Sequence, residues 1–266
     1  MSTPRRFRWA YLGRLAYEPA TRLQAAVRDE LRAGGAVDHL LLLEHPHVYT
    51  LGRSGAANDV VAPPSWLRDR GVEVVECDRG GQVTYHGPGQ LVGYPVMDLN
   101  PDRRDVRRYV RDLQEVLVRT LADYGLEAHA ETRQSLIGVW VGDAKIASIG
   151  VHLSRWITTH GFALNVCTDL SYFQGIVACG LQGVRMTSIE VETGRRLDVA
   201  EVASRVAGHF ADVFDRHPEP VAASDVLSLA TAPGATSPPA PSPVAANATA
   251  GEVSTGDGSV PGRSVE

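Results

Sequence analysis

One cation differs from all the others in this chain. The sequence holds 26 lysine and arginine residues, and Lys145 is its single lysine. A guanidinium stays protonated near neutral pH, whereas a desolvated lysine amine can lose its proton and act as a base. Lys145 stands in the run GDAKIASIG, just after a turn signal and among apolar residues. Its rarity and setting indicate a catalytic lysine; the alternative is one surface lysine that has survived by chance.

Cys179 is the candidate nucleophile that such a lysine would activate. It stands in GIVACGL, between an apolar run and a glycine, as an exposed thiol on a loop would. Cys77 and Cys167 lie beside or inside expected strands, where a free cysteine is usually a small buried hydrophobic residue. A neutral lysine amine can take the thiol proton, and the resulting ammonium stabilises the thiolate. Such a pair predicts attack on a thioester.

A glycine-rich segment, DRGGQVTYHGPGQLVGYP (78–95), is the candidate binding loop. Glycines let the backbone approach a ligand closely and leave N–H groups free to bind it. The segment is not a phosphate-binding loop, because no lysine follows the glycines, and it lacks the strand–G-x-G-x-x-G–helix pattern of a dinucleotide site. The alternative is an ordinary glycine-rich hairpin loop.

Histidines give a weaker indication. His45 and His47 are spaced like half of a metal site, to which Cys77 and His86 could be added. No C-x-x-C or H-E-x-x-H motif accompanies them, so we expect no metal. His152 and His160 flank an expected turn between two strands, and we predict that they are packed or surface residues.

The composition excludes several classes of protein. The net charge of −5 provides no basic surface for nucleic acid. No apolar run reaches the ~18 residues of a membrane span, and the basic start leads into no apolar signal-peptide core. The three cysteines have no paired spacing, which favours a reducing compartment. We therefore expect a cytoplasmic protein that binds neither nucleic acid nor membrane.

Hydrophobic patterns predict the elements that would position these residues. Apolar residues recur at helical spacing over 23–31, over 106–121 and after Asp198, which can cap its helix together with Glu201. Short apolar runs predict strands at 39–45, 72–76, 90–99 and 156–166, and a hairpin over 136–153. Runs of neighbouring strands with a few helices predict an α+β fold with a mixed or antiparallel sheet and packed helices.

The C-terminal end has a different composition. From Thr231 to Glu266 there is no Leu, Ile, Met, Phe, Tyr or Trp, and Ala, Pro, Ser, Thr and Gly dominate. Such a segment cannot bury enough apolar surface to offset its ordering entropy. We predict a catalytic domain over 1–220 and a disordered tail over 221–266.

Three of these segments together resemble the octanoyltransferase family of lipoate biosynthesis, the octanoyl-[acyl-carrier-protein]:protein N-octanoyltransferases. They are RGGQVTYHGPGQLVGYPVMDL (79–99), GVWVGDAKIASIGVHLSRWITTHGFALNV (138–166) and the Cys-Gly pair at 179–180. The similarity runs from about Tyr11 to Phe214. One residue departs from it, because Ala178 stands where the family often has proline, and alanine leaves the backbone of that loop more conformational freedom.

The resemblance implies the fold of the biotin and lipoate protein ligases and a role for each matching residue. The catalytic pair would be Cys179 and Lys145, with no cofactor and no metal. The acyl-binding residues would be Arg79, Gly80, Gly81, Gln82, Val83, Thr84, Tyr85, His86, Ser148, Ile149, Gly150, Gly161, Phe162 and Ala163. Their apolar neighbours Val83, Ile149, Val151, Phe162 and Leu164 could line a tunnel for the acyl chain, or simply belong to the core.

The implied reaction moves octanoyl from octanoyl-acyl carrier protein to a lysine of lipoyl domains, through a thioester on Cys179. The implied acceptors are the lipoyl domains of 2-oxoacid dehydrogenase complexes and the glycine cleavage H protein. Backbone N–H groups near Gly80, Lys145 or Gly180 could stabilise the oxyanion. Two alternatives stay open: an ATP-dependent lipoate or biotin protein ligase, and a non-catalytic module that binds acyl carriers or lipoyl domains.

Overall fold

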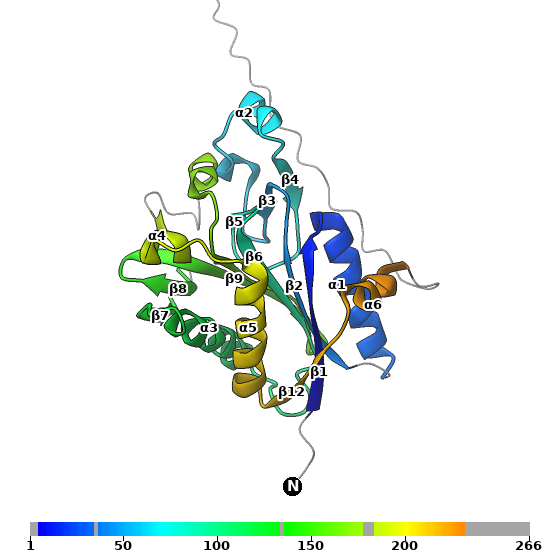
Figure 1. Cartoon of the computed structure of the whole chain (residues 1–266). Coiled ribbons are helices and arrows are strands. Elements are labelled where there is room, and N and C mark those ends of the chain that lie inside the picture. Colours follow the sequence, from blue (N-terminus) through cyan, green and yellow to red (C-terminus); the bar gives the residue numbers. More distant parts are fainter. Residues whose placement is uncertain (1–4, 35–36, 134–135, 178–183, 232–266) are drawn as a thin grey trace, which may run out of the picture.

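A mixed β-sheet forms the body of the molecule (Figure 1). The computed structural model describes residues 5–34, 37–133, 136–177 and 184–231. Along the sheet the strands are β12 (Arg216–Pro220), β1 (Arg5–Arg14), β2 (Asp38–Glu44), β6 (Gln90–Val96), β10 (Ile157–Asn165), β9 (Ala144–Ser154), β8 (Gly138–Val141) and β7 (Ala128–Glu131), and the short β11 (Arg185–Met186) pairs with β9. β1 runs parallel to β12 and β2, and the other pairs from β2 to β7 are antiparallel. This confirms the predicted α+β fold with a mixed sheet.

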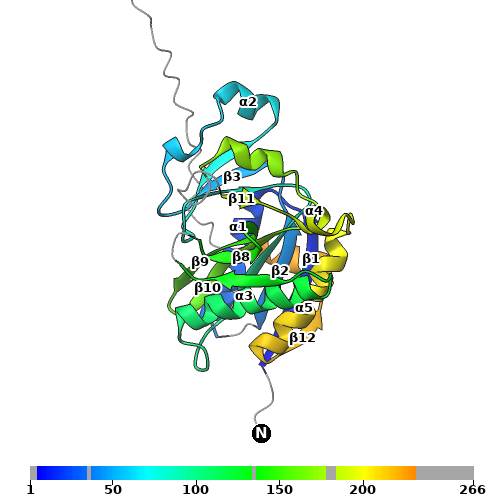
Figure 2. The ribbon, with the colours of Figure 1, turned by 90° about the vertical axis from the view of Figure 1, so that its left-hand side faces the viewer.

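Helices cover both faces of this sheet (Figure 2). On one face α3 (Val106–Ala122) and α5 (Val199–Phe214) pack against each other and enclose the larger hydrophobic core. On the other face α1 (Tyr17–Arg32) covers a smaller core. The predicted cap at Asp198 is present, because its side chain accepts a hydrogen bond from the Ala200 amide. Asp105, which was not predicted, caps α3 by accepting one from the Arg108 amide. No helix among the described residues is long and apolar enough to cross a bilayer.

A second, smaller sheet lies beside the first, at the top of Figure 1. Its strands, in the order β4 (Glu73–Glu76), β3 (Val48–Leu51) and β5 (Val83–His86), pack with α2 (Pro64–Asp69) and the 3₁₀ helix η2 (Leu170–Gly175). Two further short elements are η1 (Ala57–Asp59) and α4 (Ile189–Thr193). The chain between β4 and β5 is the RGGQ part of the glycine-rich segment, so this sheet holds that loop over the main sheet.

The edge strand β12 was not predicted, because its sequence RHPEP is polar. An ion pair, rather than the burial of apolar side chains, attaches β12 to the rest of the sheet. The Arg216 guanidinium lies 3.4 Å from the Asp38 carboxylate of β2, and both side chains are almost completely buried. Arg5 of β1 contacts the same carboxylate at 3.4 Å, so one acidic group joins three neighbouring strands.

The predicted domain boundary at residue 220 is wrong. Helix α6 (Ala223–Ser228) and the 3₁₀ helix η4 (Leu229–Thr231) continue the fold beyond it. Val226 is 2% exposed and belongs to the core under α1, where Leu23 and Val27 also lie. The segment is too short to show helical periodicity, which explains why the sequence did not reveal it. Residues 232–266, the remainder of the predicted tail, lie outside the described residues.

Two truncations should therefore behave differently. A chain that ends after Thr231 keeps every described contact, and we expect unchanged thermal stability. A chain that ends after Pro220 loses Val226 from the core, where a valine-sized side chain contributes roughly 1.5–3 kcal/mol. Its melting temperature should be lower by roughly 3–12 °C. Differential scanning calorimetry of both chains checks this, and a large loss in the first would mean that residues 232–266 dock.

Candidate functional site

A cavity of about 640 Å³ lies between the glycine-rich loop and strands β9 and β10 of the main sheet. Thirteen of the fourteen predicted acyl-binding residues are on its wall: Arg79, Gly80, Gly81, Gln82, Val83, Thr84, His86, Ser148, Ile149, Gly150, Gly161, Phe162 and Ala163. Lys145 lines it as well. Segments that are about 60 residues apart in the sequence thus form one site.

Tyr85 does not line this cavity, so its place among the predicted binding residues is not supported by the geometry. It stands on β5 between Thr84 and His86, which do line it, but its ring packs in the core of the small sheet. There the ring is fully buried, and its hydroxyl is hydrogen-bonded to His47 Nδ1 at 2.8 Å. Tyr85 therefore supports the small sheet.

Lys145 owes its position to a β-bulge in β9. The neighbours Val139 and Trp140 of β8 pair with Ala147 and Lys145, so Ile146 is one extra residue in β9. Ile146 and Ala147 both enter the larger core, whereas Lys145 and Ser148 both line the cavity. The lysine side chain is 2% exposed, and its Nζ lies 5.8 Å from the centre of the Trp140 ring.

Gly138 of β8 provides the space for the lysine stem. A β-carbon on Gly138 would lie 2.3 Å from the Ala147 carbonyl oxygen and 2.6 Å from Lys145 Cε, so no side chain fits there. The carbonyl of Gly138 accepts a hydrogen bond from the buried Gln114 amide of α3 at 2.9 Å. The same amide donates to the Glu131 carbonyl of β7 at 2.8 Å, so α3 holds both strands beside the amine.

Arg79 fixes the glycine-rich loop from inside. Its buried guanidinium donates to the Thr50 hydroxyl at 2.8 Å and to the Thr50 carbonyl at 2.6 Å. The following residue, Gly80, donates its amide to the Val151 carbonyl of β9 at 2.9 Å. These bonds hold the loop against the part of β9 that extends beyond its pairing with β8. The loop backbone is therefore preorganised around the cavity.

His160 is packed, as predicted, but its ring also lines the cavity. Its Nε2 lies 2.7 Å from Asp78 Oδ1, and this hydrogen bond lowers the pKa of Asp78 to about 2. His160 has a φ of 56°, a conformation that non-glycine residues rarely adopt. Its amide donates to the buried Gln24 side chain of α1 at 2.6 Å, which holds this backbone in place. The sequence pattern of the strand gave no signal of that bend.

The nitrogens of His45, one of the two histidines spaced like half of a metal site, are hydrogen-bonded to other protein groups. His45 Nδ1 donates to the Leu15 carbonyl at 2.7 Å, and Nε2 accepts from the Tyr94 hydroxyl at 2.8 Å. Burial lowers the pKa of His45 to about 4 and that of His86 well below its usual value, so both rings are neutral. Within the described residues, no three His, Cys, Asp or Glu side chains are placed to hold a metal ion.

Neither described cysteine has the setting of a nucleophile. The Cys77 thiol donates to the Leu51 carbonyl at 3.3 Å. Burial raises the pKa of Cys167, which disfavours its thiolate. Neither residue lines the cavity that holds Lys145. Cys179, the predicted nucleophile, lies outside the described residues.

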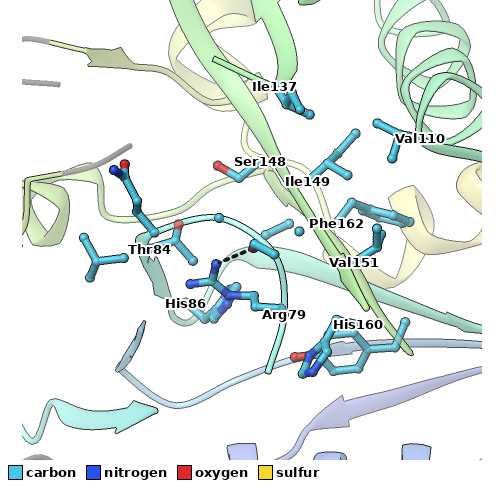
Figure 3. A pocket seen from close by; sticks show the side chains of 18 of the residues that line it. Arg79, Thr84, His86, Val110, Ile137, Ser148, Ile149, Val151, His160 and Phe162 are labelled. Atoms are coloured by element: carbon cyan, nitrogen blue, oxygen red, sulfur yellow. Dashed lines mark hydrogen bonds between the residues drawn. The ribbon is translucent and has the colours of Figure 1, made fainter. Parts of the chain in front are cut away.

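The cavity has a polar side and an apolar arm (Figure 3). Arg79, Thr84 and His86 gather on the polar side. The apolar arm, as we call it, is formed by side chains that cluster on the other side of β9: Val110, Ile137, Ile149, Val151 and Phe162. Val110 of α3 and Ile137 were not predicted, since only the tertiary fold brings them here. Leu164 was considered for a tunnel but belongs to the core.

Comparison with known proteins gives a consistent result. The family described as the lipoyl protein ligase A/B catalytic domain matches residues 16–211. A protein named octanoyltransferase from Solibacter usitatus is 52% identical over 204 residues, covering 77% of this chain and 91% of that protein. One of the same name from Syntrophotalea carbinolica is 47% identical over 203 residues, covering 76% and 92%.

Solved structures show a similar fold at low sequence identity. A lipoate-protein ligase A bound with ATP has a TM-score of 0.67 and is 18% identical, covering 86% of this chain and 93% of that one. A bipartite lipoate protein ligase from Thermoplasma acidophilum, described with its E2 lipoyl domain, has a TM-score of 0.65 at 17% identity, covering 86% and 91%.

Proposed function

This chain belongs to the octanoyltransferases of the lipoyl protein ligase A/B catalytic domain family, and we propose that it works through a Cys179 thioester with octanoyl-acyl carrier protein as donor. Membership makes it an acyltransferase that moves octanoyl groups in protein lipoylation. The observation that supports the proposed chemistry is one cavity in which a buried lysine and an apolar arm meet.

The first half of the reaction loads the enzyme. The Lys145 amine takes the proton of the Cys179 thiol, and the thiolate attacks the carbonyl carbon of the octanoyl thioester. The new carbon–sulfur bond forms as the bond to the carrier's pantetheine sulfur breaks. The departing thiolate takes the proton from the Lys145 ammonium, which returns the amine to its starting state.

The second half unloads it onto the acceptor. A neutral lysine amine of a lipoyl domain attacks the acyl-enzyme, and Cys179 leaves as the thiolate. The amine's surplus proton passes to Lys145 and then to the thiolate, which restores the enzyme. Exchange between two thioesters is nearly isoenergetic, and the step from thioester to amide is downhill. The two acyl-transfer steps therefore need neither ATP nor a metal ion.

We propose lipoyl domains of 2-oxoacid dehydrogenase complexes and the glycine cleavage H protein as acceptors, and a cytoplasmic location. The ATP-dependent ligase alternative rests on the fold shared with the lipoate-protein ligases. Such an enzyme activates its acid as an adenylate and has no use for a thiol at position 179. ATP dependence therefore separates the two functions.

Intact-protein mass spectrometry tests the proposal. The full chain is incubated with octanoyl-acyl carrier protein and no ATP. We expect a mass gain of one octanoyl group, removal of that group by neutral hydroxylamine, and mapping of the label to Cys179. Addition of a lipoyl domain should then move the octanoyl group to that domain. A label that forms only with ATP, a label on Cys77, or no label at all would contradict the proposal.

A further inference from the structure

One ring of the apolar arm lies across a glycine of the neighbouring strand. Phe162 of β10 is directly opposite Gly93 of β6 in their antiparallel register. A β-carbon on Gly93 would overlap ring atoms Cζ and Cε1 of Phe162 and would lie 2.7 Å from Cε2. The ring therefore occupies the space that a side chain at position 93 would need.

The position of this ring decides how much of the arm is open. Phe162 is 3% exposed and packs in the larger core, where close packing leaves no room for a displaced ring. The open space beside it is the arm that it lines together with Val110 and Ile149 (Figure 3). A ring pushed away from Gly93 must move into that arm.

We propose that Gly93 selects the length of the acyl chain by letting the Phe162 ring lie over β6. This inference rests on the proposed function, because it assigns the acyl tail to the apolar arm. Gly93 is a positioning residue, since it acts through Phe162 and is absent from the cavity wall. The Phe162 ring in turn ends the apolar arm and excludes acyl chains longer than octanoyl.

The test compares butyryl-, hexanoyl-, octanoyl- and decanoyl-acyl carrier protein as donors. In Gly93→Ala the displaced ring shortens the arm, so kcat/KM for octanoyl should fall by about tenfold or more, the scale of a mismatch of one or two methylenes. The butyryl value should stay within about threefold of wild type, because a short chain does not reach the ring. Phe162→Leu should raise the decanoyl value relative to octanoyl.

A double variant and a control separate this effect from general damage. Adding Phe162→Leu to Gly93→Ala removes the displaced ring and should restore octanoyl transfer. Gly208→Ala on α5 is the matched control, because its β-carbon would meet no atom within 4 Å. Melting temperatures are measured for all variants. If Gly93→Ala does not fold, the chain-length profile of Phe162→Leu alone still tests whether this ring limits the length of the acyl chain.

The outcomes also separate the two proposals. A wild-type protein that transfers none of the four acyl groups overturns the proposed function. A wild-type protein that prefers octanoyl, together with a Gly93→Ala variant that loses all chain lengths equally or none, overturns the role of Gly93 alone. A Phe162→Leu variant with the wild-type chain-length profile also overturns it.

Discussion

Replacement of Cys179 by serine is expected to lower octanoyl transfer by about four orders of magnitude or more, the scale seen when a covalent nucleophile is removed. A cysteine thiol has a pKa near 8.5 and reaches the thiolate readily beside a cation, whereas a serine hydroxyl does not ionise in that range. Steady-state transfer from octanoyl-acyl carrier protein to a lipoyl domain measures the loss.

Cys77→Ser and Cys167→Ser are the matched controls for this variant. Neither residue lines the cavity, so both should keep turnover within about threefold of wild type, apart from any cost in stability. The Cys179→Ser protein should also fail to gain the octanoyl mass. Substantial residual turnover in that variant, or an acyl label on Cys77, would show that the nucleophile is misassigned.

Replacement of Lys145 is expected to have the second largest effect. Lys145→Ala should lower turnover by roughly 10²–10⁴-fold, the range for a lost general base, and should slow alkylation of Cys179 by iodoacetamide. Lys145→Arg should fall comparably in turnover, because a guanidinium with a pKa above ~12 cannot take a proton near neutral pH. The arginine variant keeps the positive charge, so its Cys179 should still react rapidly with iodoacetamide.

Comparison of these two readouts separates the two roles of the lysine. Lys145→Met serves as the control for packing, since it keeps the stem against Gly138 and removes the charge. An arginine variant with near-native turnover would show that Lys145 acts by charge alone, and the single lysine of this chain would then be a coincidence. We expect Lys145 to act by proton transfer. An arginine at position 145 would have supplied the charge equally well, yet this chain has its single lysine there.

The elements that follow one pattern along the chain could be predicted. The helix expected over 106–121 is α3, and the run at 39–45 is β2, displaced by one residue. Elements that depend on distant partners could not be predicted. β12 is polar and held by an ion pair between Arg216 and Asp38, and α6 inserts little more than Val226 into the core. Neither feature leaves a periodic pattern.

The site divides in the same way. Three segments of the resembled family, 79–86, 148–150 and 161–163, contributed most of the cavity wall. Their one misplaced member, Tyr85, packs in the core of the small sheet. Val110 and Ile137 reach the cavity only through tertiary packing. The strained backbone of His160 depends on Gln24, a residue of another element, so no local pattern could indicate it.

The extra residue in β9 has a consequence for comparing or redesigning such proteins. Side chains of a strand alternate with a period of two, so the bulge at Ile146 shifts the phase of everything before it relative to everything after it. The Lys145 side chain is on the cavity side only because that phase shift is present. An alignment that places a gap at this bulge would pair the lysine with a residue on the opposite face of the strand. A scaffold that takes the lysine without the bulge would turn its side chain away from the cavity. In such a strand, an odd or even number of intervening residues decides which face of the sheet a side chain occupies.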